Sequence, residues 1–431
     1  MITTIIAPAT AMVPGAIGIV RLSGPKALEI AKQITSCQNI EPRYAHFVDV
    51  GCGELIDKAI LIYFKGPASF TGEDVVEIHL HGNPLVLTDV ISLGVQFGAT
   101  MADPGEFSKR AFLNGKMSLD QVEAIADLIH AKSAKAARSA ALSLDGALKA
   151  CVDHFQSRLM ALRVLLEAAI DFAEEDIPTL TPEHLEKELK LLQREITSLH
   201  ARSQQGAALA KGICICLVGR PNAGKSTLMN LICQKKVSIV TAEAGTTRDI
   251  IEREVVYKGH SMMFLDTAGL RSTSNQAEAQ GVALATQALK NADLVLHLMD
   301  VTDPGHEDIQ TEAPVWTVFN KVDLLQIKPT SKSNVFQISA KEETGVELLL
   351  DAIVALQNKT EVGEAPFSAR QRHVSILHRA KESLMRIDAE IEVELLAQHL
   401  YDIQEVLSEI TGAVTCDDVL GEIFADFCIG K

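Results

Sequence analysis

A chain of 431 residues exceeds what one hydrophobic core can organise, so about two to four domains are expected. With 47% apolar and only 4% aromatic residues, the composition is typical of a helix-rich globular protein, and no apolar run is long enough to span a bilayer. The 40 basic and 56 acidic residues leave a formal charge of −16, which excludes nucleic-acid binding by general electrostatics, so an RNA substrate would require a local basic patch or a partner.

The N-terminal segment and the cysteines indicate a cytoplasmic protein. The opening residues MITTIIAPAT lack the basic region and the long apolar core of a signal peptide. None of the eight cysteines belongs to a C-x-x-C pair, which in a cytosolic chain argues against both a zinc site and a disulfide framework.

The first half of the chain is predicted to contain an α+β domain followed by helices. In residues 1–116 we expect strands at Ile17–Leu22, Lys58–Phe64 and Val75–Leu80, and helices at Pro25–Ile34 and Pro84–Phe97. Residues 117–210 contain long Ala/Leu stretches with little Gly or Pro, which is typical of helices.

Apolar stripes at helical spacing occur on both sides of the middle of the chain. The first stripe, preceded by the N-cap and first-turn proline Thr181-Pro182, consists of Leu185, Leu189, Leu192, Ile196 and Leu199. The second, in residues 357–431, consists of Ile376, Ala380, Leu384, Ile387, Ile391 and Leu395. We interpret these residues as core, and the two blocks as one helical domain into which another domain is inserted.

Residues 211–356 alternate strands with helices, which predicts a doubly wound α/β sheet. The expected strands are Ile213–Val218, Glu252–Tyr257, Ser261–Leu265, Leu294–Met299, Pro314–Asn320 and Asn334–Ile338. Sheets of this kind bind ligands at the C-terminal ends of their strands, which is where the next motifs lie.

Gly219–Ser226 reads GRPNAGKS and matches the phosphate-binding loop G-x-x-x-x-G-K-[ST] between a strand and a helix. Its glycines allow backbone N–H groups to converge on phosphate oxygens at the helix N-terminus. We expect Lys225 to reach the β- and γ-phosphates and the Ser226 hydroxyl to bind Mg²⁺.

Further motifs predict that the nucleotide is a guanine nucleotide. Asp266–Gly269 (DTAG) ends a strand with a carboxylate suited to the Mg²⁺ shell and a glycine suited to the γ-phosphate. In Asn320–Asp323 (NKVD), Asp323 can accept hydrogen bonds from guanine N1–H and from its exocyclic amine. Ser339–Lys341 fits a loop over the base, and Thr246–Asp249 fits a switch loop that supplies a threonine to Mg²⁺.

The residue after DTAG is Leu270, where many GTPases have a glutamine that orients the attacking water. Leucine cannot hydrogen-bond to water, so either hydrolysis is slow or another residue takes this role. Glu278 is the carboxylate of the polar segment Arg271–Gln280, and it is either that residue or a solvated surface charge.

The chain ends in FCIGK at Phe427–Lys431, after GEDVVE, GRPNAGKS, GTTRD and DTAGL in one order. With these motifs it resembles, over its whole length, the MnmE (TrmE) family of tRNA-uridine-modifying GTPases. The resemblance implies an N-terminal α+β domain that binds folate and dimerises, and a P-loop GTPase domain inserted in an all-α helical domain.

The resemblance also implies a reaction. GTP hydrolysis drives the installation of a carboxymethylaminomethyl or aminomethyl group at C5 of the wobble uridine of tRNAs. The family acts as a homodimer, joined by the FAD protein MnmG in a heterotetramer, and takes a one-carbon unit from 5,10-methylene- or 5-formyl-tetrahydrofolate. No membrane is involved.

The implied site residues follow from the same resemblance. Folate contacts fall on Arg21, Glu77, Lys116 and Lys431, which would otherwise be ordinary salt-bridging residues. The family's K⁺, which takes the place of an arginine finger, has as implied ligands Asn222, Thr241, Glu243 and Thr246, and Mg²⁺ has Ser226 and Thr247. Glu278 takes the water-orienting role. The implied nucleotide-site residues are Asn222, Ala223, Gly224, Lys225, Ser226, Thr227, Thr241, Ala242, Glu243, Ala244, Gly245, Thr246, Thr247, Asp266, Thr267, Ala268, Gly269, Asn320, Lys321, Asp323, Ser339, Ala340 and Lys341.

Cys428 matches the cysteine of the family's C-terminal C-x-G-K. A thiolate there could add to C6 of a uracil and activate C5, and the alternative is a packing cysteine beside the folate site. For the whole chain, the alternative function is that of a regulatory GTPase switch in ribosome assembly. Such switches usually carry a basic RNA-binding appendage, whereas the flanks here are acidic and helical.

Overall fold

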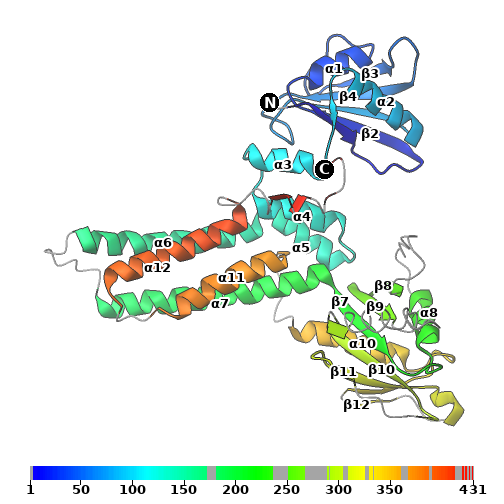
Figure 1. Cartoon of the computed structure of the whole chain (residues 1–431), viewed down its shortest axis with the longest axis vertical. Coiled ribbons are helices and arrows are strands. Elements are labelled where there is room, and N and C mark those ends of the chain that lie inside the picture. Colours follow the sequence, from blue (N-terminus) through cyan, green and yellow to red (C-terminus); the bar gives the residue numbers. More distant parts are fainter. Residues whose placement is uncertain are drawn as a thin grey trace, which may run out of the picture. The chain divides into compact units, whose positions relative to one another are not determined.

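The computed structural model of the chain describes residues 3–171, 181–235, 251–266, 289–290, 292–303, 309–325, 330–332, 334–360, 367–387, 391–412, 420–421, 423–424, 427 and 430. The backbone divides into two compact units, whose helices and strands are labelled in Figure 1. The first contains Met1–Ala126, Ser143–Ile196 and Ile376–Lys431, and the second contains Asp127–Leu142 and Thr197–Ser375. Among the described residues, no helix has the length and apolar character needed to cross a membrane.

The first unit begins with a six-stranded sheet. Its strands, in spatial order, are β3 (Ala45–Val50), β4 (Asp57–Phe64), β5 (Val75–Gly82), β2 (Gly15–Ser23), β1 (Ile5–Pro8) and β6 (Thr100–Met101). Neighbouring strands are antiparallel except β1 and β6, which are parallel. Helices α1 (Ala27–Ile34) and α2 (Pro84–Gln96) cover one face, and α3 (Glu106–Leu113) follows.

The three predicted strands and two predicted helices of this region are confirmed, and each predicted end lies within two residues of the observed one. The sequence patterns missed β1, β3 and β6. All four residues of β1 are buried, so it lacks the alternation of a half-buried strand, and β6 has only two residues.

The two faces of this sheet differ because successive side chains of a strand point to opposite sides. Val20 and Leu22 of β2 and Ile78 of β5 belong to the core under α1 and α2. The intervening residues form the outer face, where the register places Phe47 opposite Ile60, Ile60 opposite His79, and His79 opposite Ile19. The adjacent row consists of Ala45, Ile62, Glu77 and Arg21.

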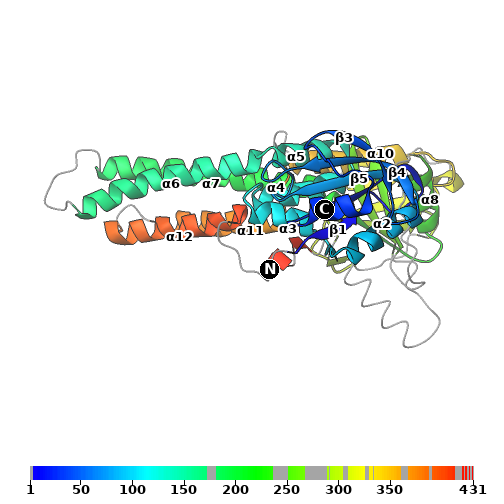
Figure 2. The ribbon, with the colours of Figure 1, turned by 90° about the horizontal axis from the view of Figure 1, so that it is seen from above.

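Among the described residues, the helical blocks before and after the second unit's sheet contain α4 (Leu119–Ile129), α5 (Ala134–Leu144), α6 (Ala147–Asp171), α7 (Pro182–Lys211), α11 (Gln371–Met385) and α12 (Val393–Thr411). Helices α6 and α12 lie side by side (Figures 1 and 2), with reciprocal bonds between the side-chain amides and backbone carbonyls of Gln156 and Gln404. The Gln193 amide of α7 donates to the Leu384 carbonyl of α11 at 3.2 Å. The two helical blocks therefore pack together although the second unit's sheet separates them in sequence.

The first predicted stripe is confirmed, since all five residues from Leu185 to Leu199 are buried. The second is wrong at its end, because Leu395 is 50% exposed. Helix α11 ends at Met385 and α12 begins at Val393, so the 3.6-residue spacing of buried positions in α11 does not continue into α12. The buried stripe of α12 is instead Leu396, Leu400, Ile403, Leu407 and Ile410.

The second unit contains a seven-stranded sheet. Its strands, in spatial order, are β12 (Ser331–Lys332), β13 (Val335–Gln337), β11 (Val315–Asn320), β10 (Leu294–Asp300), β7 (Ile213–Val218), β9 (His260–Asp266) and β8 (Ile251–Tyr257). The five central strands are parallel and the two edge strands antiparallel. The core of one face joins the sheet to α8 (Lys225–Lys235) and α10 (Val346–Thr360). All six predicted strands are confirmed within one residue at each end, and only the two-residue β12 was missed.

Candidate functional site

The phosphate-loop motif lies between β7 and α8, and both of its glycines are required by close contacts. Gly219 has φ +144°, and a Cβ there would lie 2.1 Å from the Leu298 carbonyl oxygen of β10. Gly224 has φ +94°, and its Cβ would lie 2.1 Å from Nδ2 of Asn320. Any side chain at either position would collide, so the loop can approach β10 and β11 only with glycine there.

Asn320 connects the loops of this site. It is the last residue of β11 and is 2% exposed. Its Nδ2 donates to the Ala223 carbonyl at 2.9 Å, and its Oδ1 accepts from the Ala340 backbone N–H at 2.9 Å. One buried amide therefore holds the phosphate loop, the NKVD motif and the SAK segment together.

The carboxylate expected to recognise guanine is held by the SAK segment. Asp323 lies in the short 3-10 helix η2 (Val322–Leu325), and its Oδ1 accepts from Ser339 Oγ at 2.5 Å. The same hydroxyl accepts from the backbone N–H of Glu342 at 3.1 Å. Because Ser339 is itself fixed, the orientation of the Asp323 side chain is set by the loop that follows β13.

Lys225, Ser226 and Thr227 form the first turn of α8. The Lys225 ammonium donates to the carbonyls of Gly219 at 2.5 Å and Arg220 at 2.9 Å, so the loop wraps around it. Asn222 has φ +64°, a left-handed conformation that asparagine tolerates, and is exposed.

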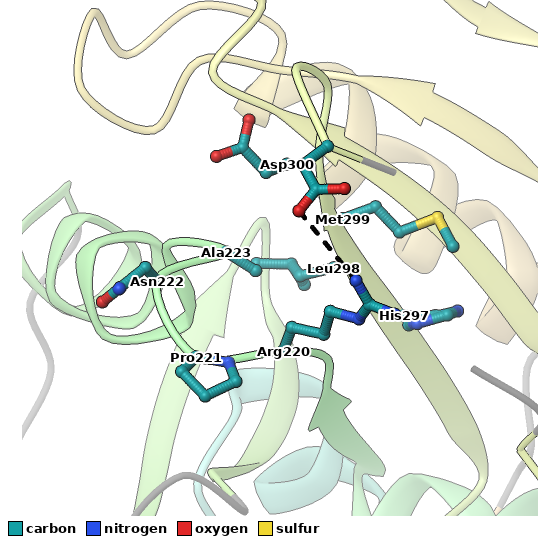
Figure 3. A pocket seen from close by; sticks show the side chains of 9 residues that line it. Arg220, Pro221, Asn222, Ala223, His297, Leu298, Met299 and Asp300 are labelled. Atoms are coloured by element: carbon teal, nitrogen blue, oxygen red, sulfur yellow. Dashed lines mark ion pairs between the residues drawn. The ribbon is translucent and has the colours of Figure 1, made fainter. Parts of the chain in front are cut away.

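A cavity of about 230 Å³ borders this loop. In Figure 3, Arg220, Pro221, Asn222 and Ala223 line it from the phosphate loop, and His297 to Asp300 line it from β10. Asp303 also lines the cavity, and its Oδ2 lies 4.0 Å from Arg220 Nη1.

Sequence reasoning missed Asp300. Its Oδ2 accepts from the Lys321 ammonium at 2.6 Å, and its Oδ1 accepts from the Thr302 backbone N–H and hydroxyl at 3.0 and 2.7 Å. The bond from Lys321, followed by those from Thr302, lowers the pKa of Asp300 to about 2. The signal that singled out Asp266, a carboxylate ending an apolar strand, applies equally to Asp300.

Several predicted site residues lie outside the described part of the chain: Thr241, Ala242, Glu243, Ala244, Gly245, Thr246, Thr247, Thr267, Ala268, Gly269, Glu278, Cys428 and Lys431. Asp266 ends β9, and only its backbone is described. In the described ranges there is no cluster of three or more His, Cys, Asp or Glu residues that could hold a metal ion.

Arg21 and Glu77 form a second polar site, on the outer face of the N-terminal sheet. They are opposite each other on β2 and β5, and Glu77 Oε1 accepts from Arg21 Nε at 2.9 Å and Nη2 at 2.8 Å. The Arg21 guanidinium lies 5.6 Å from the ring centroid of Phe70 and 5.7 Å from that of Phe107. His79 Nε2 is 3.3 Å from the other carboxylate oxygen of Glu77.

The C-terminal residues reach this second site. The Gly430 carbonyl accepts from Arg21 Nη1 at 3.4 Å, and at φ +96° a Cβ on Gly430 would lie 1.9 Å from the Pro8 carbonyl oxygen. Phe424 and Phe427 anchor this tail among Leu119, Val122 and Ala126 of α4. Of the predicted folate contacts, the structure brings Arg21 and Glu77 together beside the C-terminal residue Gly430. The ammonium of Lys116, another predicted folate contact, donates to the Pro67 carbonyl at 3.0 Å.

Known proteins match the whole chain. One family model, described as the MnmE helical domain, matches residues 119–428, and another, the GTP-binding protein TrmE N-terminus, matches residues 4–116. The tRNA modification GTPase MnmE of Francisella philomiragia subsp. philomiragia is 41% identical over an alignment of 446 positions, which covers 99% of each chain. The protein of the same description from Francisella tularensis subsp. novicida has the same identity and coverage.

The chain belongs to the MnmE family. Both polar sites lie in regions that the MnmE and TrmE family models match. Among solved structures, a variant of Aquifex aeolicus Era bound to GDP·AlF4− overlaps with 41% of this chain and 68% of its own, at 24% identity and a TM-score of 0.28.

Replacing Asn320 by alanine should destabilise the second unit. The Ala223 carbonyl and the Ala340 N–H would lose their buried partner, which costs about 1–3 kcal/mol of unfolding free energy. The single tryptophan, Trp316, is buried in β11 against Phe336 and reports on this sheet by fluorescence during urea unfolding.

The matched control is Asn83→Ala, which removes the side-chain cap of α2 in the first unit and should leave the Trp316 transition unchanged. An Asn320→Ala chain that unfolds at the native urea concentration would contradict the role assigned to this amide.

Proposed function

We propose that this MnmE-family chain is a GTPase that takes part in the modification of the wobble uridine of tRNA. The observation that carries the proposal is the Asn320 amide, which joins the phosphate loop to the guanine-recognition segments. The names of the Francisella relatives, tRNA modification GTPases, supply the substrate class.

In this proposal the residues divide the work on GTP. Asp323, oriented by Ser339, accepts from the guanine edge, and Lys225 stabilises the phosphate charge that grows during transfer. Leu270 cannot orient a water molecule, so Glu278 takes that role.

Two cations fit the oxygen donors of the phosphate loop. The Ser226 hydroxyl is exposed in the first turn of α8, with Thr247 as the second protein ligand for Mg²⁺. The left-handed Asn222 presents an exposed amide for K⁺, with Thr241, Glu243 and Thr246 completing the set. When bound, these cations supply positive charge next to the transferring phosphoryl group.

GTP turnover should be at least tenfold faster in KCl than in NaCl at equal ionic strength, because the smaller cation does not match the same oxygen ligands. Glu278→Ala should lose about 10²–10³-fold in kcat while its GDP affinity stays native, because it acts on the water and not on the base. Phosphate release and fluorescent-GDP titration measure the two quantities. Equal rates in both salts would remove the K⁺ assignment, and full turnover by Glu278→Ala would remove that of the glutamate.

For the second site we propose tetrahydrofolate, in its 5,10-methylene or 5-formyl form, as the ligand. Glu77 offers carboxylate oxygens to the donor edge of a pterin, and Phe70 and Phe107 lie within stacking distance of the Arg21 guanidinium. Arg21, Lys116 and Lys431 are the cations for the folate carboxylates. Folate bound here would lie beside Gly430, which follows two residues after Cys428, the proposed nucleophile for uracil C6, in the sequence.

The strongly acidic chain does not by itself attract tRNA, so a partner that contributes a basic surface is needed. We propose the FAD protein MnmG as this partner, in a heterotetramer that works in the cytoplasm and takes FAD chemistry from MnmG.

Arg21→Ala should weaken 5,10-methylene-tetrahydrofolate binding about tenfold or more, because it removes a charged contact and the two bonds that orient Glu77 Oε1. Isothermal titration measures this, with Lys58→Ala, an exposed cation of the same sheet, as control. In a deletion strain, nucleoside analysis of tRNA should show the wobble modification restored by the native gene and not by Arg21→Ala. An intact modification in the deletion strain would refute the proposed function.

We further propose that the outer face of the N-terminal sheet is the homodimer surface. Phe47 of β3 is 74% exposed, Ile17 of β2 64% and Ile60 of β4 44%, although all three belong to strands of the sheet. Several exposed apolar side chains on one face of a sheet are unusual for a surface that contacts only water. The same face carries Arg21 and Glu77, so a second copy would also shield the proposed folate site.

Phe47→Asp should raise the dimer dissociation constant about tenfold or more, because it places a charge in an apolar contact. Sedimentation velocity over a concentration series measures this. Leu85→Asp is the matched control, since Leu85 is 73% exposed on α2, under the opposite face. A Phe47→Asp chain that dimerises like the native chain would place the interface elsewhere.

A further inference from the structure

Asp300 is held in one orientation by its own turn. It is the last residue of β10 and lies opposite Asn320 in the parallel ladder with β11. Its carbonyl accepts from the Asp303 N–H at 3.1 Å, and its Oδ1 accepts both bonds from Thr302. The carboxylate therefore cannot rotate without losing two hydrogen bonds.

The other oxygen of Asp300 holds Lys321. Lys321 follows directly on Asn320 and has a left-handed backbone conformation at φ +66°. The side chains of Asn320 and Lys321 therefore point in very different directions. Asn320 is 2% exposed, whereas the Lys321 side chain is 32% exposed and its ammonium lies 2.6 Å from Asp300 Oδ2. With its carboxylate only 22% exposed, Asp300 forms a partly shielded ion pair.

This arrangement lowers the cost of ordering the NKVD motif. A lysine has four rotatable side-chain bonds, and a ligand that needs it in one place must otherwise pay for their ordering. The bond from Lys321 to Asp300 orders the lysine side chain before the ligand binds. Asp300 lies at a strand end that also lines the cavity beside the phosphate loop. The buried Asn320 anchors the loop backbone, and the Asp300 contact anchors the partly exposed Lys321 side chain next to it.

We propose that Asp300 is a positioning residue for guanine-nucleotide binding, acting through Lys321. The inference rests on the proposed GTP binding and extends it to a residue outside the phosphate-loop, DTAG, NKVD and SAK motifs.

The test is a double-mutant cycle on the full chain, with the dissociation constant of fluorescent GDP and the kcat for GTP as readouts. Asp300→Asn should raise the dissociation constant about fivefold or more, and in the Lys321→Met background it should add less than about twofold. At saturating GTP its kcat should stay within about twofold of native, because the contact orders binding and not the chemical step. Asp300→Glu should recover part of the affinity.

A matched control separates positioning from stability. Asp351 of α10 also accepts from a lysine, Lys258 Nζ at 2.5 Å, and from the Tyr257 hydroxyl at 3.0 Å, in the same unit. Asp351→Asn removes a lysine–aspartate pair that is more exposed, and it should leave the GDP affinity native, even where it lowers the thermal midpoint as much as Asp300→Asn does.

The possible outcomes separate the two claims. A native chain that fails to bind GDP removes the proposed function and this inference with it. A native chain that binds, together with an Asp300→Asn chain of native affinity, overturns the inference alone. An Asp300→Asn effect that persists undiminished in the Lys321→Met background also overturns it, because Asp300 would then act without Lys321.

Discussion

The nucleotide site depends on one buried amide. Asn320 uses its donor on the phosphate loop and its acceptor on the segment after β13, so two loops far apart in sequence are held at one distance. A buried amide with both partners satisfied stabilises, whereas one that loses a partner destabilises, so the contact has little tolerance for rearrangement. Gly224 follows from this constraint, because the amide occupies the space that a side chain there would need.

Residues near the strand ends around Asn320 hold the other polar side chains of the NKVD motif in place. Ser339 orients Asp323, and Asp300 holds Lys321, so each polar side chain of the NKVD motif that faces the site has a partner from a neighbouring strand or loop. Parallel strands end at one edge of a sheet, which is why side chains separated by many residues in sequence meet there. The site is thus built by the sheet more than by any single motif.

The N-terminal sheet serves two purposes because its faces alternate. One face builds a core with α1 and α2, and the other presents Arg21, Glu77 and exposed apolar side chains. The C-terminal tail adds to this face because Phe424 and Phe427 anchor it on α4. The hydrogen bond from Arg21 to the Gly430 carbonyl therefore brings residues from both ends of the chain together on this face.

The sequence alone predicted the fold class, most of the strands and the motifs of the candidate nucleotide site. Apolar periodicity located every strand of the second unit except the two-residue β12, since that signal is local and strong. The motifs from Gly219 to Lys341 identified the loops because each requires particular residue types at short spacing. Short or fully buried strands such as β1, and the new helical phase of α12, lack such a local signal.

Tertiary structure alone decided which side chains act together. No local pattern tells that Asp300 meets Lys321, that Gly224 must leave room for Asn320, or that Gly430 lies against Arg21. These contacts join residues that only strand register and long-range packing bring within hydrogen-bond distance. The phosphate loop could be predicted from the sequence, whereas the residues that hold it in place could not. A binding motif consists of the residues that contact the ligand, and the tertiary fold determines which other residues hold those in position.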